Sequence, residues 1–260
     1  MRWIGSTEPS LTQKRRQLIY LKSAADVHGE ICVTDLSKIK NVPAELKDLK
    51  QWVCWKSVER DGRITKMPVD ATTGRPGKSN DPATWTDFEA ACDGAVGLEA
   101  SGVGFCFSED DGLVGIDLDA CIDCKGKIAD WALDILDSFG SYAEISPSGR
   151  GLKIWCLGTI PKGYKINLGP KDEEIGKAPG IEVYTDGRYF AVTGDRWEGS
   201  REDIVSCQPQ LDRLIERYWS TGTDHRTTAS NLHESGRRTA GIDAGTSGSV
   251  SGKDADCGEW

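Results

Sequence analysis

Two aspartates, Asp117 and Asp119, follow a short apolar stretch and are separated by one leucine. Side chains alternate between the two faces of a β-strand, so residues two apart point the same way, with Cα atoms roughly 6–7 Å apart. Carboxylates held on one face repel each other unless a cation neutralises them. Mg2+ prefers oxygen ligands, and a phosphate substrate often completes its coordination shell. The pair therefore indicates a divalent metal site, with solvated acids at an exposed strand end as the alternative.

The segment 146–153, SPSGRGLK, combines small residues with Ser148, Arg150 and Lys153. Small residues let backbone N–H groups approach a phosphate closely, while the hydroxyl and the two cations add further donors. A Walker A loop leads into a helix, whereas this segment leads into a strand pattern, so a P-loop ATPase is not expected. The segment predicts a phosphate-binding loop, and an exposed turn between two strands is the other interpretation.

Glu182 lies in the middle of the apolar stretch 181–184. A carboxylate inside a sheet is costly unless it is paired or bound to a metal, so Glu182 is a candidate third acid for the aspartate pair. It could instead lie on a solvated face, or pair across strands with Arg188, which begins the next expected strand. The cluster of three acids is the hypothesis that we carry forward.

Further cations lie upstream, in or beside the loop at residues 72–79. This loop is rich in glycine, hydroxyl groups and positive charge, and it contains Arg75 and Lys78, while Lys66 precedes it. These residue types suit contacts to phosphate groups. We interpret Lys66, Arg75 and Lys78 as candidate contacts to phosphate.

The order of the elements that must position these residues predicts an α+β fold, an antiparallel or mixed sheet backed by helices. Turn signals at Asp111-Gly112 and Asp186-Gly187 predict two hairpins, one joining strands 103–107 and 113–119 and one joining strands 181–184 and 188–193. Further strands are expected at residues 51–55, 142–145 and 152–157, helices at 44–50, 81–91, 129–139 and 210–219, and a polar excursion at 158–180.

Three regions follow from this pattern. Residues 1–42 are expected to form a polar N-terminal extension, and residues 43–219 a globular domain that carries the candidate site. Residues 220–260 contain few large apolar side chains, so they cannot bury enough surface to order themselves and are expected to be disordered.

Composition limits the class of protein. The chain has 260 residues, of which 38% are hydrophobic and 28% charged, which is ordinary for a globular protein. The net charge of −9 means that a nucleic acid partner must meet a local basic patch. No membrane span or signal peptide is indicated, and nine unpatterned cysteines suggest a reducing cytoplasm. The pair Cys121 and Cys124 lacks two further ligands, so zinc is not favoured there.

Taken together and in order, these motifs resemble the catalytic module of primase-polymerases of the archaeo-eukaryotic primase superfamily, in their phage and plasmid type. The resemblance covers roughly residues 43–198 and implies an RRM-like catalytic core with an N-terminal α/β module. The motifs that carry it are GIDLD (115–119), SGRGLK (148–153), IEVY (181–184) and GRYFAVTG (187–194), preceded by WVCWK (52–56), KMPVD (66–70), TGRPGKSNDPATW (73–85) and GVGFCF (102–107).

The resemblance implies template-directed nucleotidyl transfer, with Asp117, Asp119 and Glu182 holding two Mg2+ or Mn2+ ions. Ser148, Arg150 and Lys153 then clamp the triphosphate of an incoming NTP or dNTP, with Arg188 nearby, and Lys66, Arg75 and Lys78 are candidate contacts to the template or to phosphate. The nucleic acid partner is a single-stranded DNA template or a primer-template. Since no Walker A motif is present, a separately encoded replicative helicase is a possible partner, in the host cytoplasm if the protein is phage-encoded.

One position departs from the family pattern, because Lys153 stands where the second motif commonly has histidine. Lysine keeps a donor and a positive charge, although its reach differs from that of imidazole. Three other functions remain open: a primase-like module that binds nucleic acid without polymerising, a glycosyltransferase that uses the Asp-x-Asp pair, and a phosphodiester hydrolase. The helix-alternating pattern expected of a nucleotide-sugar domain is missing, which disfavours the second.

Overall fold

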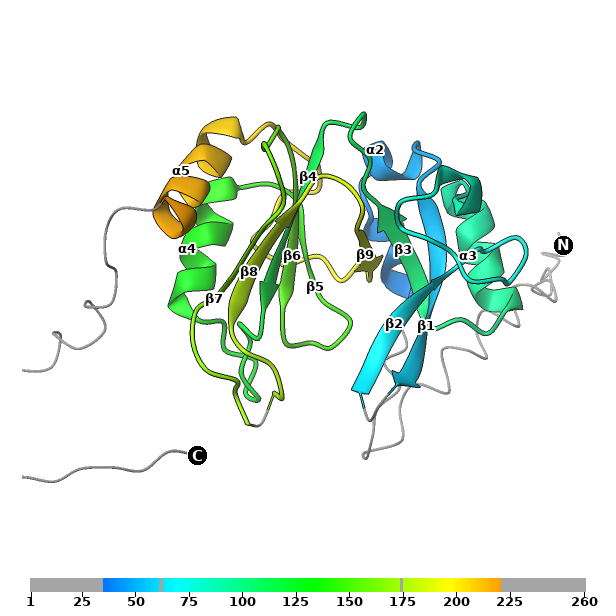
Figure 1. Cartoon of the computed structure of the whole chain (residues 1–260), viewed down its shortest axis with the longest axis horizontal. Coiled ribbons are helices and arrows are strands. Elements are labelled where there is room, and N and C mark those ends of the chain that lie inside the picture. Colours follow the sequence, from blue (N-terminus) through cyan, green and yellow to red (C-terminus); the bar gives the residue numbers. More distant parts are fainter. Residues whose placement is uncertain (1–34, 61–62, 174, 221–260) are drawn as a thin grey trace, which may run out of the picture. The chain divides into compact units, whose positions relative to one another are not determined.

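The computed structural model describes residues 35–60, 63–173 and 175–220, and its nine described strands form two sheets (Figure 1). The strands are β1 (Trp52–Arg60), β2 (Arg63–Val69), β3 (Gly102–Cys106), β4 (Leu113–Asp119), β5 (Ala143–Ile145), β6 (Leu152–Leu157), β7 (Tyr164–Asn167), β8 (Gly180–Tyr184) and β9 (Tyr189–Val192). The helices are α2 (Ala44–Lys47), α3 (Phe88–Gly97), α4 (Asp130–Phe139) and α5 (Gln208–Trp219), with 3-10 turns η1 (Leu36–Asn41) and η2 (Pro82–Thr84).

The four-stranded sheet has the order β2-β1-β3-β9, and the five-stranded sheet has the order β5-β6-β4-β8-β7. All pairings between these strands are antiparallel. The predicted α+β class with antiparallel strands is therefore confirmed, but the strands are divided between two sheets. β4, which carries the two aspartates, is the central strand of the larger sheet.

Both predicted hairpins are wrong. β3 and β4 follow each other in sequence but belong to different sheets, and β8 and β9 likewise separate. The turn signals are real, since Gly112 and Gly187 have left-handed backbone angles (φ of 68° and 63°). A turn reverses the chain without specifying the pairing partner, and here each chain reversal carries the chain from one sheet to the other.

Several boundaries also differ from the prediction: α2 ends at Lys47, β1 continues to Arg60, and α5 begins at Gln208. The expected helix at residues 81–91 is split: Asp81 caps only the 3-10 turn η2, and α3 begins at Phe88 with Asp87 as its N-cap. The expected excursion at residues 158–180 contains the short edge strand β7. The expected extension and tail lie largely outside the described residues.

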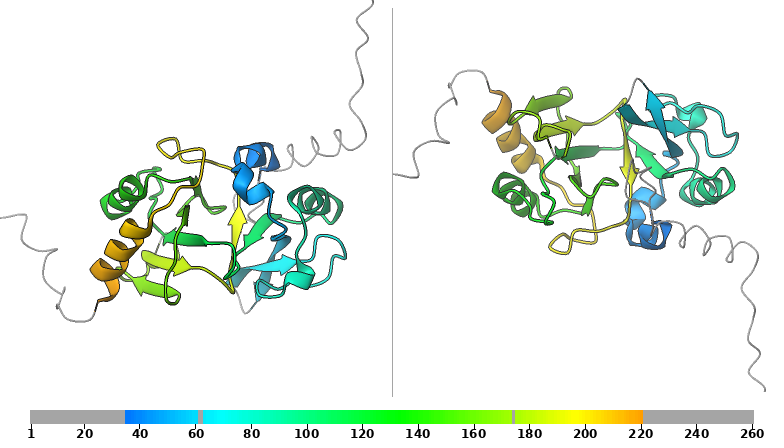
Figure 2. Two further views of the ribbon diagram at one scale, coloured as in Figure 1. Left: turned by 90° about the horizontal axis from the view of Figure 1, so that it is seen from above. Right: turned by 90° about the horizontal axis from the view of Figure 1, so that it is seen from below.

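Alternation along β4 divides the five-stranded sheet into two different faces. Ile116 and Leu118 are fully buried and belong to a core cluster with residues of α4 and α5. α4 presents Ile135 and Phe139 to this core and ends at Gly140, whose left-handed conformation (φ 52°) terminates the helix. Figures 1 and 2 show both helices on the side of this sheet away from β9.

The opposite face of the five-stranded sheet meets β9, the edge strand of the other sheet. Phe190 of β9 packs edge-on against Trp155 of β6, with ring centroids 5.1 Å apart. Gly115 of β4 lies beneath the same ring, since a Cβ there would stand 2.8 Å from Phe190 and 2.4 Å from Phe107. The alternation that buries Ile116 and Leu118 against the helices therefore turns Asp117 towards the junction of the two sheets.

No helix in the described part of the chain is both long enough and apolar enough to cross a membrane.

Candidate active site

Five charged side chains form one row across the five-stranded sheet. Asp117 on β4 is directly opposite Lys153 on β6 and Glu182 on β8. The row continues outward because Glu144 on β5 pairs with Lys153, and Lys165 on β7 pairs with Glu182. Residues directly opposite in an antiparallel sheet share a face. The structure therefore brings together the acids that the sequence nominated from separate motifs.

Lys153 is the central cation of this row. Its Nζ lies 2.8 Å from Oδ2 of Asp117, and its side chain is only 7% exposed. The same ammonium group lies 4.1 Å from the ring centroid of Phe190, close enough for a cation–π interaction. Both contacts hold Lys153 in place on the sheet.

The other two acids are paired with lysines that the sequence did not nominate. Lys165 forms an ion pair with Glu182, and this hydrogen bond raises the pKa of the Lys165 ammonium. Lys177, from the loop between β7 and β8, lies 2.6 Å from Oδ1 of Asp119. Burial raises the pKa of the Asp119 carboxyl, the charge of Asp117 adds to this effect, and Lys177 opposes it.

The donor set suits a hard divalent cation, because it consists of carboxylate oxygens on one face. In the described residues, however, no three acidic, histidine or cysteine side chains are gathered closely enough to hold a metal ion. The ion pairs account for this, since the three carboxylates are turned towards three different ammonium groups. The three acids therefore have the ligand type that a divalent metal needs and share one face of the sheet. In this structure each of them is paired with a lysine.

The predicted phosphate loop joins β5 and β6 and lies against the end of β4. A Cβ on Gly151 would stand 2.7 Å from the carbonyl oxygen of Leu118 and 3.7 Å from Cα of Asp119. Ser146 and Ser148 approach each other through their hydroxyl oxygens, 3.1 Å apart, and Gly149 adopts a left-handed angle (φ 68°). Ser148 is exposed and Arg150 is half-buried.

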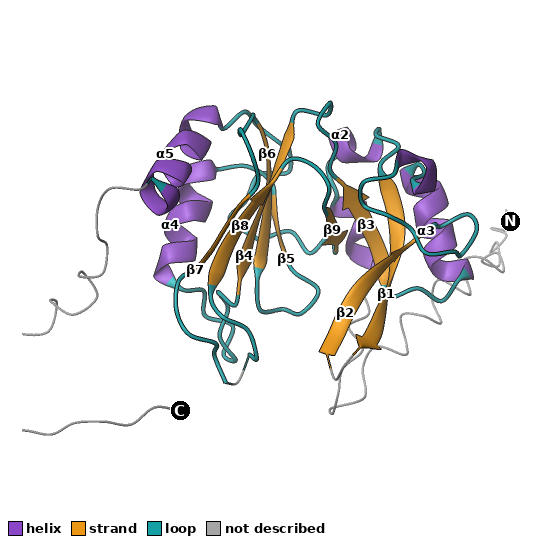
Figure 3. Cartoon of the chain, in the orientation of Figure 1, coloured by secondary structure: helices purple, strands orange, loops and turns teal. Residues whose placement is uncertain are grey.

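Three connections leave the same end of the five-stranded sheet, the end where Asp119 lies. These are the connection that follows β4 (residues 120–129), the connection between β5 and β6 (residues 146–151), and the described parts of the connection between β7 and β8 (Figure 3). Antiparallel order causes this, because β4, β5 and β7 finish where β6 and β8 begin. The phosphate loop and the loop that carries Lys177 are consequently neighbours of the acids.

The remaining predicted cations lie towards the opposite end of the sheet. Arg188 follows β8 and lies over the ring of Tyr184, with its guanidinium carbon 5.4 Å from the ring centroid. The loop that carries Lys78 is attached nearby, because the Ser79 hydroxyl donates to the carbonyl of Gly187 at 2.9 Å.

Lys66 of β2 is close to the same region, since the Tyr189 hydroxyl donates to the Lys66 carbonyl at 2.9 Å. Arg75, in the loop beyond β2, accepts a backbone hydrogen bond from Asp70. The nominated phosphate ligands therefore fall into two groups, one in the loop beside Asp119 and one on segments near Arg188. The alternative pairing of Glu182 with Arg188 is wrong, because the strand neighbours of Glu182 are Asp117 and Lys165.

Glu144 was missed by the sequence analysis, although it belongs to the charged row. It is fully buried and accepts hydrogen bonds from the backbone N–H groups of Thr193 (2.9 Å) and Gly194 (3.0 Å) and from the Tyr142 hydroxyl (3.1 Å). Burial raises the pKa of this carboxyl to about 7. A lone glutamate in a three-residue strand has no distinguishing sequence pattern.

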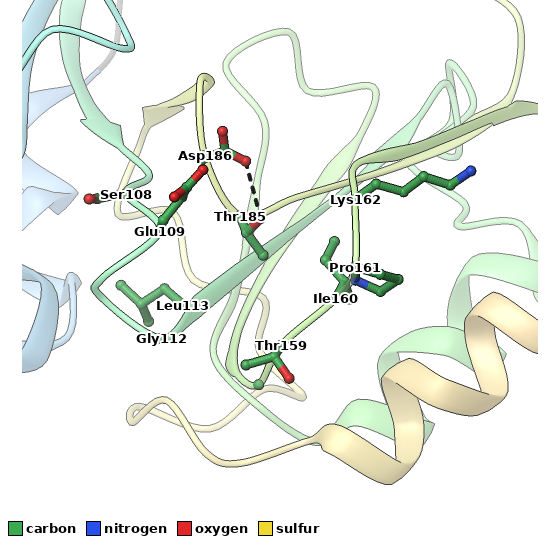
Figure 4. Close-up of a pocket in the computed structure, with 11 residues that line it drawn as sticks. Ser108, Glu109, Gly112, Leu113, Thr159, Ile160, Pro161, Lys162, Thr185 and Asp186 are labelled. Atoms are coloured by element: carbon green, nitrogen blue, oxygen red, sulfur yellow. Dashed lines mark hydrogen bonds between the residues drawn. The ribbon is translucent and has the colours of Figure 1, made fainter.

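A surface pocket of about 290 Å3 lies at the Leu113 end of β4, away from the acids (Figure 4). Its lining is mixed and includes Glu109, Lys162, Thr185 and Asp186. Thr185 and Asp186 are joined by a hydrogen bond of 3.3 Å. None of the acids of the charged row lines this pocket, so it is a separate feature of the surface.

Comparison with known proteins agrees with the motif analysis. No protein-family model matches the chain. Over 169 residues the chain is 37% identical to the DNA primase-polymerase of Nitratiruptor phage NrS-1. The matched stretch is 64% of this chain and 22% of that protein, so the chain spans about a fifth of the length of the relative. The similarity supports a module of the phage primase-polymerase type within this chain.

Proposed function

We propose that this chain is a primase-polymerase module that joins nucleotides on a DNA template during replication of a phage or plasmid-like element. The observation that carries the proposal is that Asp117, Asp119 and Glu182 share one face of two neighbouring strands, β4 and β8. The similarity to a phage DNA primase-polymerase supports the same reaction. We also propose that the fold is primase-like, with an RRM-like catalytic core.

Asp117, Asp119 and Glu182 are proposed to hold two Mg2+ or Mn2+ ions. When bound, such ions lower the pKa of an attacking 3′-hydroxyl and stabilise the charge on the departing pyrophosphate. The carboxylates supply oxygen ligands from a partly buried face, with side chains 17%, 13% and 15% exposed in the order named. Exclusion of water there strengthens their interaction with a cation.

Ser148 and Arg150 are proposed to bind the triphosphate from the loop beside Asp119. Lys153 has a narrower role than the motif alone indicated, because its buried ammonium group is already paired with Asp117. The Lys153 ammonium group can therefore contact only a phosphate that lies next to Asp117. Arg188, together with Lys66 and Lys78 from segments that hydrogen-bond to residues beside it, is proposed to contact the nucleotide or the template strand.

The partners in this proposal are a single-stranded template or primer-template, NTPs or dNTPs, and a separately encoded replicative helicase in the host cytoplasm. The net charge of −9 disfavours a strong general attraction to DNA. Binding is therefore expected to depend on local lysines and arginines and to weaken as salt rises.

The test is extension of a primed single-stranded DNA template, with Mg2+ and Mn2+ and with dNTPs and NTPs in separate reactions. Asp117→Asn is expected to reduce extension by more than about 100-fold, since a lost metal contact removes several kcal/mol of transition-state stabilisation. Asp134→Asn is the matched control, because Asp134 is an exposed acid of α4 on the helical side of the sheet. Equal activity in wild type and Asp117→Asn would contradict the assignment.

A second candidate function is a module that binds nucleic acid without polymerising it. The ion pairing of each of the three acids with a lysine favours this reading, because it neutralises the face without a metal. Metal-independent DNA binding by folded protein, with no extension under any of the four conditions, is the result that would select it.

A further inference from the structure

The three lysines on the acidic face differ sharply in burial. The side chain of Lys153 is 7% exposed, whereas Lys165 is 65% exposed and Lys177 is 58% exposed. The ammonium groups of Lys165 and Lys177 are well solvated when they leave the acids, although the carboxylates of Glu182 and Asp119 are only 15% and 13% exposed. Releasing these two lysines therefore costs less than releasing the buried ammonium group of Lys153.

The positions of the two exposed lysines allow such an exchange. Lys165 belongs to β7, the edge strand of the sheet, and Lys177 lies on the loop that follows it. Both have long flexible side chains whose charged ends reach the acids from the solvent side. Their backbones remain beside the acidic face when the ammonium groups leave the carboxylates.

Charge balance indicates what replaces them. With Lys153 in place and the other two lysines withdrawn, the three carboxylates keep two uncompensated negative charges, which one divalent cation neutralises. A nucleotide triphosphate then adds more negative charge than a second divalent cation removes. The displaced ammonium groups lie close to this excess charge, and lysine binds phosphate well as a compact point charge.

We propose that Lys165 and Lys177 are exchangeable counter-ions that hold Glu182 and Asp119 without metal and bind the nucleotide's phosphates once divalent cations occupy the acids. The inference rests on the proposed function, and it adds two phosphate ligands that the motifs did not indicate. It assigns opposite effects to one pair of residues: they compete with the metal, and they assist the nucleotide.

Lys153 behaves differently in this scheme. Its ion pair with Asp117 is buried, and its contact with Phe190 gives the ammonium group a second partner. Withdrawing Lys153 would move a side chain that is only 7% exposed and break both contacts at once, whereas the side chains of Lys165 and Lys177 are already more than half exposed. Lys153 is therefore a fixed part of the site.

The experiment compares wild type with the double variant Lys165→Met/Lys177→Met, which keeps side-chain length and removes both charges. Mn2+ binding to protein without nucleotide is measured from the paramagnetic resonance signal of unbound Mn2+. Binding of dGTP is then measured by calorimetry in saturating Mn2+ without template. Lys171→Met is the control, because Lys171 is an exposed lysine of the same loop as Lys177.

The double variant is expected to bind Mn2+ about two- to tenfold more tightly and dGTP about two- to tenfold more weakly than wild type, as loss of two exposed ion pairs implies. The control variant should match wild type in both measurements. Unchanged or weaker Mn2+ binding overturns the proposal, and so does tighter Mn2+ binding with unchanged dGTP affinity.

Primer extension by the wild-type protein alone tests the proposed polymerase function, independently of the lysine variants. Wild-type protein that extends no primer in any metal contradicts polymerase activity, whatever the lysine variants do. Wild-type protein that extends primers, with a double variant unchanged in Mn2+ binding, contradicts only the counter-ion exchange.

Discussion

Asp117 lies between Lys153 on one neighbouring strand and Glu182 on the other, so one carboxylate is attracted on one side and repelled on the opposite side. Lys153 settles this balance in the absence of metal, because a buried ion pair at 2.8 Å outweighs the neighbouring carboxylate. Lys153, which stands where the similar motif of primase-polymerases commonly has histidine, is thus the residue that holds the first acid in place. The site is therefore a set of lysine–carboxylate ion pairs, and a divalent cation that binds the carboxylates must displace lysines from them.

Glu144 provides a prediction at the same scale. Its pKa is raised from 4.5 to about 7 because it is fully buried. The folded state therefore prefers the protonated form, and the resulting stabilisation is complete below pH 4.5 and lost as pH rises through about 7. Over this pH range the free energy of unfolding therefore decreases by on the order of 3 kcal/mol.

Glu144→Gln removes this titration. We expect the fall in unfolding free energy between pH 5 and pH 8 to be smaller in the variant than in wild type, by on the order of 2–3 kcal/mol. Urea unfolding at the two pH values measures it, and groups common to both proteins cancel in the comparison. An equal fall in both proteins would show that Glu144 does not titrate in this interval.

At the scale of elements, β4 is the central strand of the larger sheet and also packs against residues of the smaller sheet. One of its faces packs against α4 and α5, and the other carries Gly115 and the aspartates. Gly115 leaves room for Phe107 and Phe190 at the junction of the sheets. A side chain there would push the two sheets apart at the point where the acidic face begins.

Gly115→Ala is therefore expected to lower the unfolding free energy by about 1–3 kcal/mol, the usual cost of overpacking a close-packed core. Gly97→Ala is the matched control, because a Cβ at this last residue of α3 would meet nothing within 4 Å. That variant is expected to be neutral or up to about 1 kcal/mol more stable, since alanine favours helix over glycine. Denaturant unfolding of both variants checks the pair, and a neutral Gly115→Ala would mean that the aromatic rings move aside freely.

At the scale of the whole described molecule, the two sheets are not independent. The chain passes from the smaller sheet to the larger one after β3 and returns after β8. Tyr142, just before β5, and Trp155 of β6 share a core cluster with Phe105 and Val192 of the smaller sheet. Glu144 adds hydrogen bonds to the backbone just beyond β9.

We therefore expect one cooperative unfolding transition, because neither sheet can lose its structure without exposing the shared core. Tryptophan fluorescence reports on both sheets, since Trp52 belongs to β1 and Trp155 to β6. The midpoint in urea should coincide for fluorescence and far-ultraviolet circular dichroism. Two separated midpoints would show that the sheets unfold as separate units.

Local sequence pattern was sufficient for the features that depend on neighbouring residues. Alternation in the GIDLD motif placed Asp117 and Asp119 on one face, and the glycine-rich segment 146–151 was identified as a loop between strands. Apolar spacing predicted α4 to within one residue at its start. These features depend on backbone geometry and periodicity, which a short stretch of sequence expresses directly.

Only the tertiary structure decided which strands pair and which cations meet the acids. The turns at Gly112 and Gly187 carry the same signal as hairpin turns, but the buried faces on either side of each turn fit different partners, so the strands separate into two sheets. Lys165 and Lys177 meet Glu182 and Asp119 because strand order brings β7 and its loop beside β8 and β4. Such contacts join residues far apart in sequence, and the energy that selects them is the packing of the whole core, which no local pattern encodes.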